Sequence, residues 1–224
     1  MLELHTWELV SVSNKPEENA STYNYLLESA LLNRAINRGL SSGEEKIHAL
    51  ADNIVNWLSN TDFYSSPAST RFHEAFEGGL VYHTLKVYNE AIQLIKLPHF
   101  RSADIDSAVL VALTHDWCKI GQYESYERNV KDDSGNWCQV SSYRTKENPS
   151  SIRLGHGPQS LVMIIQFCNG QYTHLTQEEM AAIRWHMYTY DVSSYDIRDL
   201  NTCNDNVPLV HLIQFADQLA IVNY

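Results

Sequence analysis

The sequence predicts a predominantly α-helical domain with one inserted β-hairpin. Apolar residues recur at helical spacing along seven segments, which we expect to form helices at residues 23–37, 43–59, 79–95, 102–119, 156–168, 176–187 and 208–222. Residues 122–146 break this pattern. The 224 residues are 44% hydrophobic, and no Gly-, Ser- or Pro-rich linker divides them. We therefore expect a single globular unit in which residues 1–65 form a helical segment packed on residues 66–224.

Residue types at the ends of these segments support the helices. Thr176 and Glu179 have the spacing of a capping box. Asp104 suits a helix N-terminus, and Pro208 suits a first helical turn. These signals place helix starts close to where the apolar periodicity begins.

The segment 122–146 differs from the rest of the chain. Tyr, Val, Trp and Gln residues lie on either side of the sequence Asp-Asp-Ser-Gly-Asn at 132–136. This pattern is typical of a β-hairpin with a Gly-containing turn. The segment also concentrates basic and aromatic side chains, namely Arg128, Lys131, Arg144, Lys146, Tyr123, Tyr126, Trp137 and Tyr143.

Six ionisable side chains occupy positions where the helical patterns call for core hydrophobes. In residues 102–119, for example, an apolar stripe leads in its next turns to His115, Asp116 and Lys119. Burying a carboxylate is costly unless it is paired or bound to a metal. The sequence therefore predicts one shared metal site formed by His83, His115, Asp116, His156, His186 and Asp217.

Charge and cysteine content limit the other possibilities. The formal net charge of −11 argues against an extended nucleic-acid surface. A small phosphorylated substrate is still compatible with this charge, because a dinuclear centre adds about +4 locally.

The cysteines are expected to be free thiols that are not ligands, because the chain shows no CxxC pair; they are Cys118, Cys138, Cys168 and Cys203. No membrane-spanning run or signal peptide is recognisable, and a cytoplasmic protein is expected.

The order of the six residues resembles that of the HD-domain metal-dependent phosphohydrolases. The similarity covers residues 71–219 and is strongest at residues 72–84, Phe-His-Glu-Ala-Phe-Glu-Gly-Gly-Leu-Val-Tyr-His-Thr, and 113–120, Leu-Thr-His-Asp-Trp-Cys-Lys-Ile. Both stretches look like those of YhaM-type exoribonucleases and related HD hydrolases. The hairpin is not part of the common core, and residues 1–65 lack the nucleic-acid-binding domain that those exoribonucleases carry.

This resemblance implies an HD-domain helical bundle with a catalytic domain at residues 66–224 and two metals. It assigns His83, His115, Asp116 and Asp217 to one metal, with Asp116 as a bridge, and His156 and His186 to the second. Imidazole and carboxylate ligands suit Mn, Fe, Zn, Ni or Co. Two such metals activate a water for attack on a phosphate ester. We thus expect a phosphodiesterase or nucleotidase acting on a nucleotide or short oligonucleotide.

Further residues receive expected roles at such a site. Lys119, one turn from Asp116, would lie beside the phosphoryl oxygens. His73 is a candidate for protonating the leaving oxygen, or else a structural histidine. The hairpin is either a solvated arm or a lid over the metals that selects the substrate. Candidate contacts to outer phosphates are Arg71, Arg128, Arg144, Arg153 and Arg184.

Two other functions are compatible with the same ligands. HD-fold di-iron oxygenases of the inositol oxygenase type share the ligand order and also have a Lys after the Asp. The sequence Gly78-Gly79-Leu80 before His83 favours hydrolysis over oxygenation. A non-catalytic nucleotide-binding module is the third possibility, but a degenerate copy would be expected to have lost a ligand.

Overall fold

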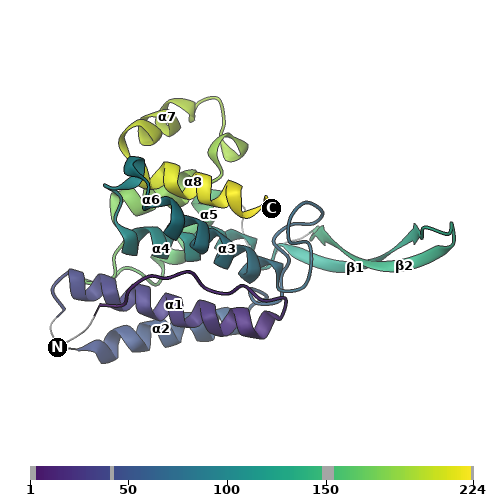
Figure 1. Cartoon of the computed structure of the whole chain (residues 1–224), viewed down its shortest axis with the longest axis horizontal. Helices are drawn as coiled ribbons and strands as arrows, with labels where there is room; N and C mark the ends of the chain where they lie inside the picture. Colours follow the sequence, from purple (N-terminus) through teal and green to yellow (C-terminus); the bar gives the residue numbers. More distant parts are fainter. Residues whose placement is uncertain (1–3, 41–42, 148–153, 223–224) are drawn as a thin grey trace.

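Eight α-helices and one β-hairpin build the part of the chain that the computed structural model describes, residues 4–40, 43–147 and 154–222 (Figure 1). The helices are α1 (Pro16–Asn37), α2 (Glu44–Ser59), α3 (Gly79–Leu94), α4 (Ile105–Thr114), α5 (His156–Ile165), α6 (Gln177–Trp185), α7 (Ile197–Asn206) and α8 (Pro208–Ala220). Three short 3-10 turns accompany them, η1 (Pro98–Phe100), η2 (Trp117–Lys119) and η3 (Tyr188–Asp191).

Helix α3 lies at the centre of the packing. It packs against α4 and α8, while α1 packs against α2, α3 and α4, and α6 packs against α5 and α8. Figure 1 shows α1 and α2 side by side along one edge of this bundle, with α7 beyond α8 at the opposite edge. One hydrophobic core joins these helices, including Leu26 of α1, Leu85 of α3 and Ile213 of α8. The prediction of a mostly helical bundle with one β-hairpin is confirmed.

The helix boundaries differ from the prediction in three places. Helix α1 begins at Pro16 instead of residue 23, because Pro at the first turn and the acidic Glu17 and Glu18 favour a helix start there. Helix α7 was not predicted, since Leu200 is its one buried residue and no apolar stripe develops. The predicted helix at 102–119 is shorter, because α4 ends before His115.

The hairpin forms as predicted, but it does not cover the predicted ligands. Strands β1 (Tyr123–Lys131) and β2 (Trp137–Thr145) pair antiparallel, with Tyr123 opposite Thr145 and Lys131 opposite Trp137. Figure 1 shows them extending away from the helical body. Asp62, after α2, holds the base of the hairpin by accepting a hydrogen bond from Gly121 N at 2.7 Å. In this structure the hairpin therefore does not form a lid over the predicted ligands.

A buried ion pair ties α1 to α6. Arg34 Nη1 contacts Glu179 Oε1, and Arg34 Nη2 donates to Glu179 Oε2 at 2.8 Å. Ser107 of α4 donates its hydroxyl proton to Glu179 Oε1 at 2.6 Å. Burial raises the pKa of Glu179, but the bonds from Arg34 and Ser107 outweigh it and hold the pKa below its ordinary value.

Glu179→Gln should lower the free energy of unfolding by about 3 kcal/mol, because the Arg34 guanidinium would stay buried without its counter-ion. A lowered carboxyl pKa stabilises the fold above the ordinary Glu value, and this stabilisation is lost as pH falls through the folded-state pKa. The wild type should therefore lose more stability than the variant between about pH 5 and pH 3. Urea titrations measure both effects, with the exposed neighbour change Glu178→Gln as control. Equal stability of the two variants would contradict this account.

Among the described residues, none of the helices combines the length and the hydropathy that crossing a membrane requires.

Candidate metal centre

The pair His115 and Asp116 lies directly after helix α4, where the chain leaves the helix before the η2 turn. The hydroxyl of Tyr23 in α1 accepts a hydrogen bond from Trp117 Nε1 at 3.0 Å and donates one to the Leu113 carbonyl at 2.9 Å. These two bonds hold the Leu113 carbonyl before the pair and the Trp117 side chain after it. Helix α1 thus helps to position the two side chains.

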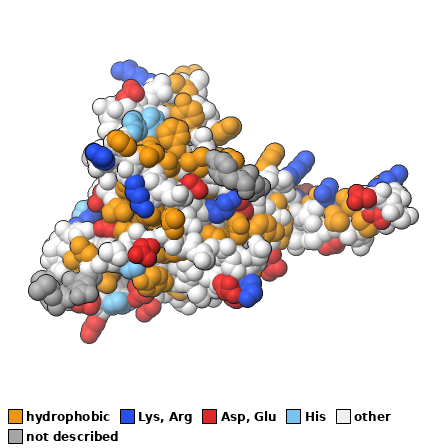
Figure 2. All heavy atoms as spheres, in the orientation of Figure 1, with side chains coloured by type: hydrophobic (Ala, Val, Ile, Leu, Met, Phe, Trp, Pro, Cys, Tyr) orange, Lys and Arg blue, Asp and Glu red, His pale blue; other side chains and the backbone are white. Residues whose placement is uncertain are grey.

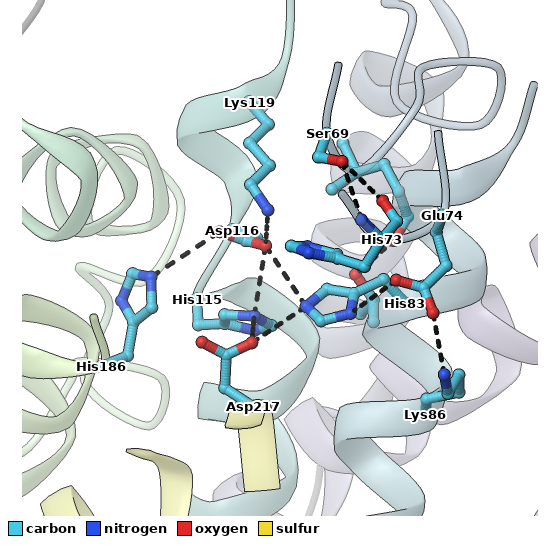
Figure 3. A network of polar contacts seen from close by, with 12 residues as sticks. Ser69, His73, Glu74, His83, Lys86, His115, Asp116, Lys119, His186 and Asp217 are labelled. Atoms are coloured by element: carbon cyan, nitrogen blue, oxygen red, sulfur yellow. Dashed lines mark hydrogen bonds and ion pairs between the residues drawn. The ribbon is translucent and has the colours of Figure 1, made fainter. Parts of the chain in front are cut away.

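His83 lies in α3, next to a loop that folds back over the start of this helix. Gly79 permits the fold, because a Cβ there would lie 1.9 Å from the Glu74 carbonyl oxygen. As a result, the ring of His73 packs against the ring of His83, with centroids 4.9 Å apart. Figure 3 shows His73 between Lys119 and His83. The close approach at Gly79 therefore brings His73 to the site.

Four ligand atoms from three segments surround one point. His83 Nε2 lies 3.0 Å from Asp217 Oδ1 and 3.7 Å from Asp116 Oδ2. His115 Nε2 lies 3.4 Å from Asp116 Oδ2 and 4.0 Å from Asp217 Oδ1. Figure 3 shows these side chains converging from α3, the end of α4 and α8.

Two further histidines approach the other oxygen of Asp116. His186 Nε2 lies 3.6 Å and His156 Nδ1 lies 4.0 Å from Asp116 Oδ1. His156 begins α5, and His186 follows α6. These helices meet closely at Gly157, where a Cβ would lie 2.0 Å from the Arg184 carbonyl oxygen. Asp116 therefore presents one oxygen to each of two groups of donors.

Backbone carbonyls set the orientation of two of the imidazoles. His115 Nδ1 lies 2.8 Å from the Ala112 carbonyl oxygen, and His186 Nδ1 lies 2.7 Å from the Ile183 carbonyl oxygen. A carbonyl oxygen only accepts, so each Nδ1 carries a proton and donates it. In the neutral ring the lone pair is then on Nε2, which faces Asp116. This arrangement of an inward nitrogen and a bonded outer nitrogen is common in metal-binding histidines.

The described residues include groups of His, Asp and Glu side chains whose ligand atoms lie close enough together to hold a metal ion. Nitrogen and oxygen ligands lie about 2.0–2.2 Å from transition-metal ions, so two ligands of one ion are about 3.0–3.5 Å apart. The separations of 3.0–4.0 Å lie at or slightly above this range. Within the described residues, four of the inward atoms are buried without a hydrogen-bond partner, namely His115 Nε2, Asp116 Oδ1, His156 Nδ1 and His186 Nε2.

Lys119 is the buried cation of the site. Its Nζ lies 2.6 Å from Asp116 Oδ2. Burial lowers the pKa of Lys119, but the Asp116 carboxylate outweighs burial and raises this pKa above its ordinary value. Burial in turn raises the pKa of Asp116, yet Lys119 and His115 hold it well below its ordinary value. The two side chains are therefore charged at neutral pH.

The histidines differ in protonation. Burial lowers the pKa of His83, but Asp217 and Glu74 outweigh it and raise the pKa to about 9. For His73, burial and the neighbouring His83 lower the pKa to about 4. His73 is thus neutral near pH 7, which weighs against its predicted role as the proton donor to the leaving oxygen.

A pocket of about 210 Å³ opens onto these residues. Its walls include His73, Lys119, His156, His186, Asp217 and, from the base of the hairpin, Tyr123. Tyr190, 84% exposed, lies among the lining residues. The pocket is large enough for a phosphoryl group and the atoms next to it.

The four predicted arginines among the described residues do not line this pocket. Arg71, Arg128 and Arg144 line a second cavity beside the hairpin. The Arg184 guanidinium lies over the ring of Trp185, 3.9 Å from its centroid. Arg153 lies outside the described residues.

Glu74 is a site residue that sequence reasoning missed. Its Oε2 lies 3.6 Å from His83 Nδ1, and its Oε1 accepts a hydrogen bond from Lys86 at 2.8 Å. Burial raises the pKa of Glu74, but His83 and Lys86 outweigh it and lower the pKa to about 2. An anionic Glu74 favours a proton on His83 Nδ1, so that Nε2 becomes the inward ligand atom once a metal displaces its proton. Because Glu74 lies in a loop, no helical periodicity indicated it.

Glu74→Gln should weaken metal binding by about 10–100-fold, because a neutral amide no longer fixes the outer proton of His83. Calorimetric titration of chelator-treated protein with Mn²⁺ or Zn²⁺ measures this affinity. Glu77→Gln, an exposed change in the same loop, is the matched control. If both variants bind metal as tightly as the wild type, Glu74 does not position His83.

Cys118 lies near the second group of donors. Its Sγ and ligand atoms of Asp116 and His156 lie within 4.8 Å of one another. Burial raises the pKa of this thiol well above its ordinary value. Since a thiolate is the form that binds metals, His186 is the better ligand beside Asp116 and His156. The expectation that the cysteines are not ligands therefore stays a prediction.

Comparisons of this chain with protein-family models, with curated proteins and with solved structures find no match.

Proposed function

We propose that this protein is a metal-dependent phosphohydrolase of the HD-domain type that hydrolyses a nucleotide-like phosphate ester. One observation carries the proposal: the Asp116 carboxylate is shared between two groups of buried ligand atoms and also contacts a buried ammonium. Two divalent transition metals bound there, from among Mn, Fe, Zn, Ni and Co, would supply an acidified water and polarise a phosphoryl oxygen.

The side chains around the centre then have distinct tasks. Asp116 would offer one carboxylate oxygen to each of the two metals, and Lys119 stabilises negative charge on the phosphoryl oxygens. His115 and His186 are held in a fixed orientation by their backbone carbonyls. We assign His73 a hydrogen bond to the substrate, because its pKa of about 4 disfavours an imidazolium. The substrate is a small phosphorylated molecule, such as a nucleotide or short oligonucleotide.

A panel of esters tests the reaction class. Metal-reconstituted protein is incubated with generic phosphodiesters, nucleoside mono- and triphosphates and short oligonucleotides, and chelator-treated protein is the control. We expect cleavage of a phosphate ester only with metal. Absence of turnover on every ester, together with a di-iron EPR signal that responds to a polyol or phosphonate, would replace the proposal with the oxygenase alternative. Ligand binding without any turnover would favour the non-catalytic module.

A further inference from the structure

A second cavity, of about 580 Å³, lies between the base of the hairpin and the loop before α3. Three arginines line it, Arg71 from the loop and Arg128 and Arg144 from the two strands. None of the lining residues is an Asp or Glu. The formal net charge of the chain is −11, so this local excess of positive charge is not a general property of the surface.

The strand register places Arg128 and Arg144 on the same face of the hairpin. Residues directly opposite each other project from the same face, and Glu124 pairs with Arg144, Tyr126 with Ser142, and Arg128 with Val140. The alternate residues project from the other face, where a different cavity is lined by Asp62 and Glu77 but by no Lys or Arg. Figure 2 shows basic side chains along one edge of the hairpin.

Two of the arginines, Arg128 and Arg144, are each fixed by a hydrogen bond from the Nε side of the guanidinium. Arg128 Nε donates to Ser142 Oγ at 2.7 Å, and Arg144 Nε donates to Glu124 Oε1 at 2.7 Å. The Arg144 guanidinium also lies 5.3 Å from the centroid of the Tyr126 ring. Glu124 offsets one of the three positive charges. The bonds among the described residues engage Nε only, which leaves the paired Nη donors that bind phosphate in a bidentate manner.

One short loop forms walls of both cavities. Ala68, Ser69 and His73 line the pocket at the metal centre, whereas Thr70, Arg71 and Ala75 line the arginine cavity. Ser69 stiffens this loop, because its hydroxyl accepts from His73 N at 3.1 Å and donates to the His73 carbonyl at 2.7 Å. The two cavities therefore share this loop as a common wall.

We propose that the arginine cavity binds a phosphate group, and that the substrate carries this phosphate in addition to the one that is cleaved. The second part rests on the proposed function. The substrate class is then a nucleoside with two phosphate groups, such as a 3′,5′-bisphosphate derivative or the end of a phosphodiester-linked strand. The aromatic ring of Tyr126 in the cavity wall suits a base next to that phosphate.

The first experiment titrates inorganic phosphate into chelator-treated protein at low ionic strength by calorimetry. We expect one binding site that weakens about three- to tenfold in each of Arg71→Gln and Arg144→Gln. Arg198→Gln, an exposed change in α7, should bind like the wild type. Absence of phosphate binding, or equal binding by the arginine variants and the wild type, would overturn the cavity assignment.

The second experiment compares two chromogenic esters on metal-loaded protein, thymidine 5′-(p-nitrophenyl phosphate) with and without a 3′-phosphate. The added phosphate should lower KM for the wild type but not for Arg71→Gln. Equal KM values for both esters in the wild type would overturn the substrate class. If the wild type hydrolyses neither ester, that result counts against the proposed function. The phosphate titration needs neither metal nor turnover, so it tests phosphate binding in the arginine cavity independently.

Discussion

Asp116→Ala should abolish binding of both metals and lower ester hydrolysis by about a thousandfold or more. The reason is geometric, because each oxygen of this carboxylate serves a different group of donors, at 3.4 Å from His115 Nε2 and 3.6 Å from His186 Nε2. The same change leaves the Lys119 ammonium buried without its counter-ion. The variant should therefore also unfold at a lower temperature than the wild type, both with and without metal.

Metal analysis and thermal unfolding measure the two effects. Asp205→Ala removes the same charge from the surface of α7 and should match the wild type in both. Asp116→Asn keeps the shape of the side chain, so it replaces the Ala variant in both measurements if that variant does not fold. Unchanged metal content in a folded Asp116 variant would contradict the role of this carboxylate as a bridge.

Lys119→Met should lower kcat by about 10²–10³-fold with little change in KM. Lys119 is 5% exposed, and its ammonium lies 2.6 Å from Asp116 Oδ2, next to the proposed ligands without being one of them. Its charge acts most strongly where negative charge develops on the phosphoryl oxygens. Metal content should stay the same or rise, because a competing cation has been removed from Asp116.

Kinetic titration of the preferred ester, with metal content measured on the same sample, tests this prediction. Lys96→Met, an exposed change at the end of α3, is the control. A loss of metal in proportion to the loss of activity would mean that Lys119 only holds the site together.

Much of the candidate site was predictable, because the ligands interrupt apolar stripes. His83, His115 and Asp217 lie on or directly after helices whose other inward residues are hydrophobic, and such positions are recognisable without a structure. The capping box at Thr176 and the first-turn Pro208 also formed as predicted. These positions depend on the spacing of residues within one helix, so the sequence of that helix is enough to predict them.

Features that depend on contacts between distant segments were not predictable. Glu74 acts from a loop whose path is set by the close approach at Gly79. The direction of the hairpin depends on Asp62, which lies 59 residues before its partner Gly121. The position of Arg71, Arg128 and Arg144 around a separate cavity follows from that direction. No periodicity within a segment encodes such contacts.

The central claim is that the six His and Asp side chains of the site hold two metals. Elemental analysis of protein purified without chelator tests it most directly, with reconstitution by Mn and Fe as the second step. We predict close to two transition-metal ions per chain in the wild type and none in Asp116→Ala. A wild-type protein that binds no metal even after reconstitution would contradict the claim.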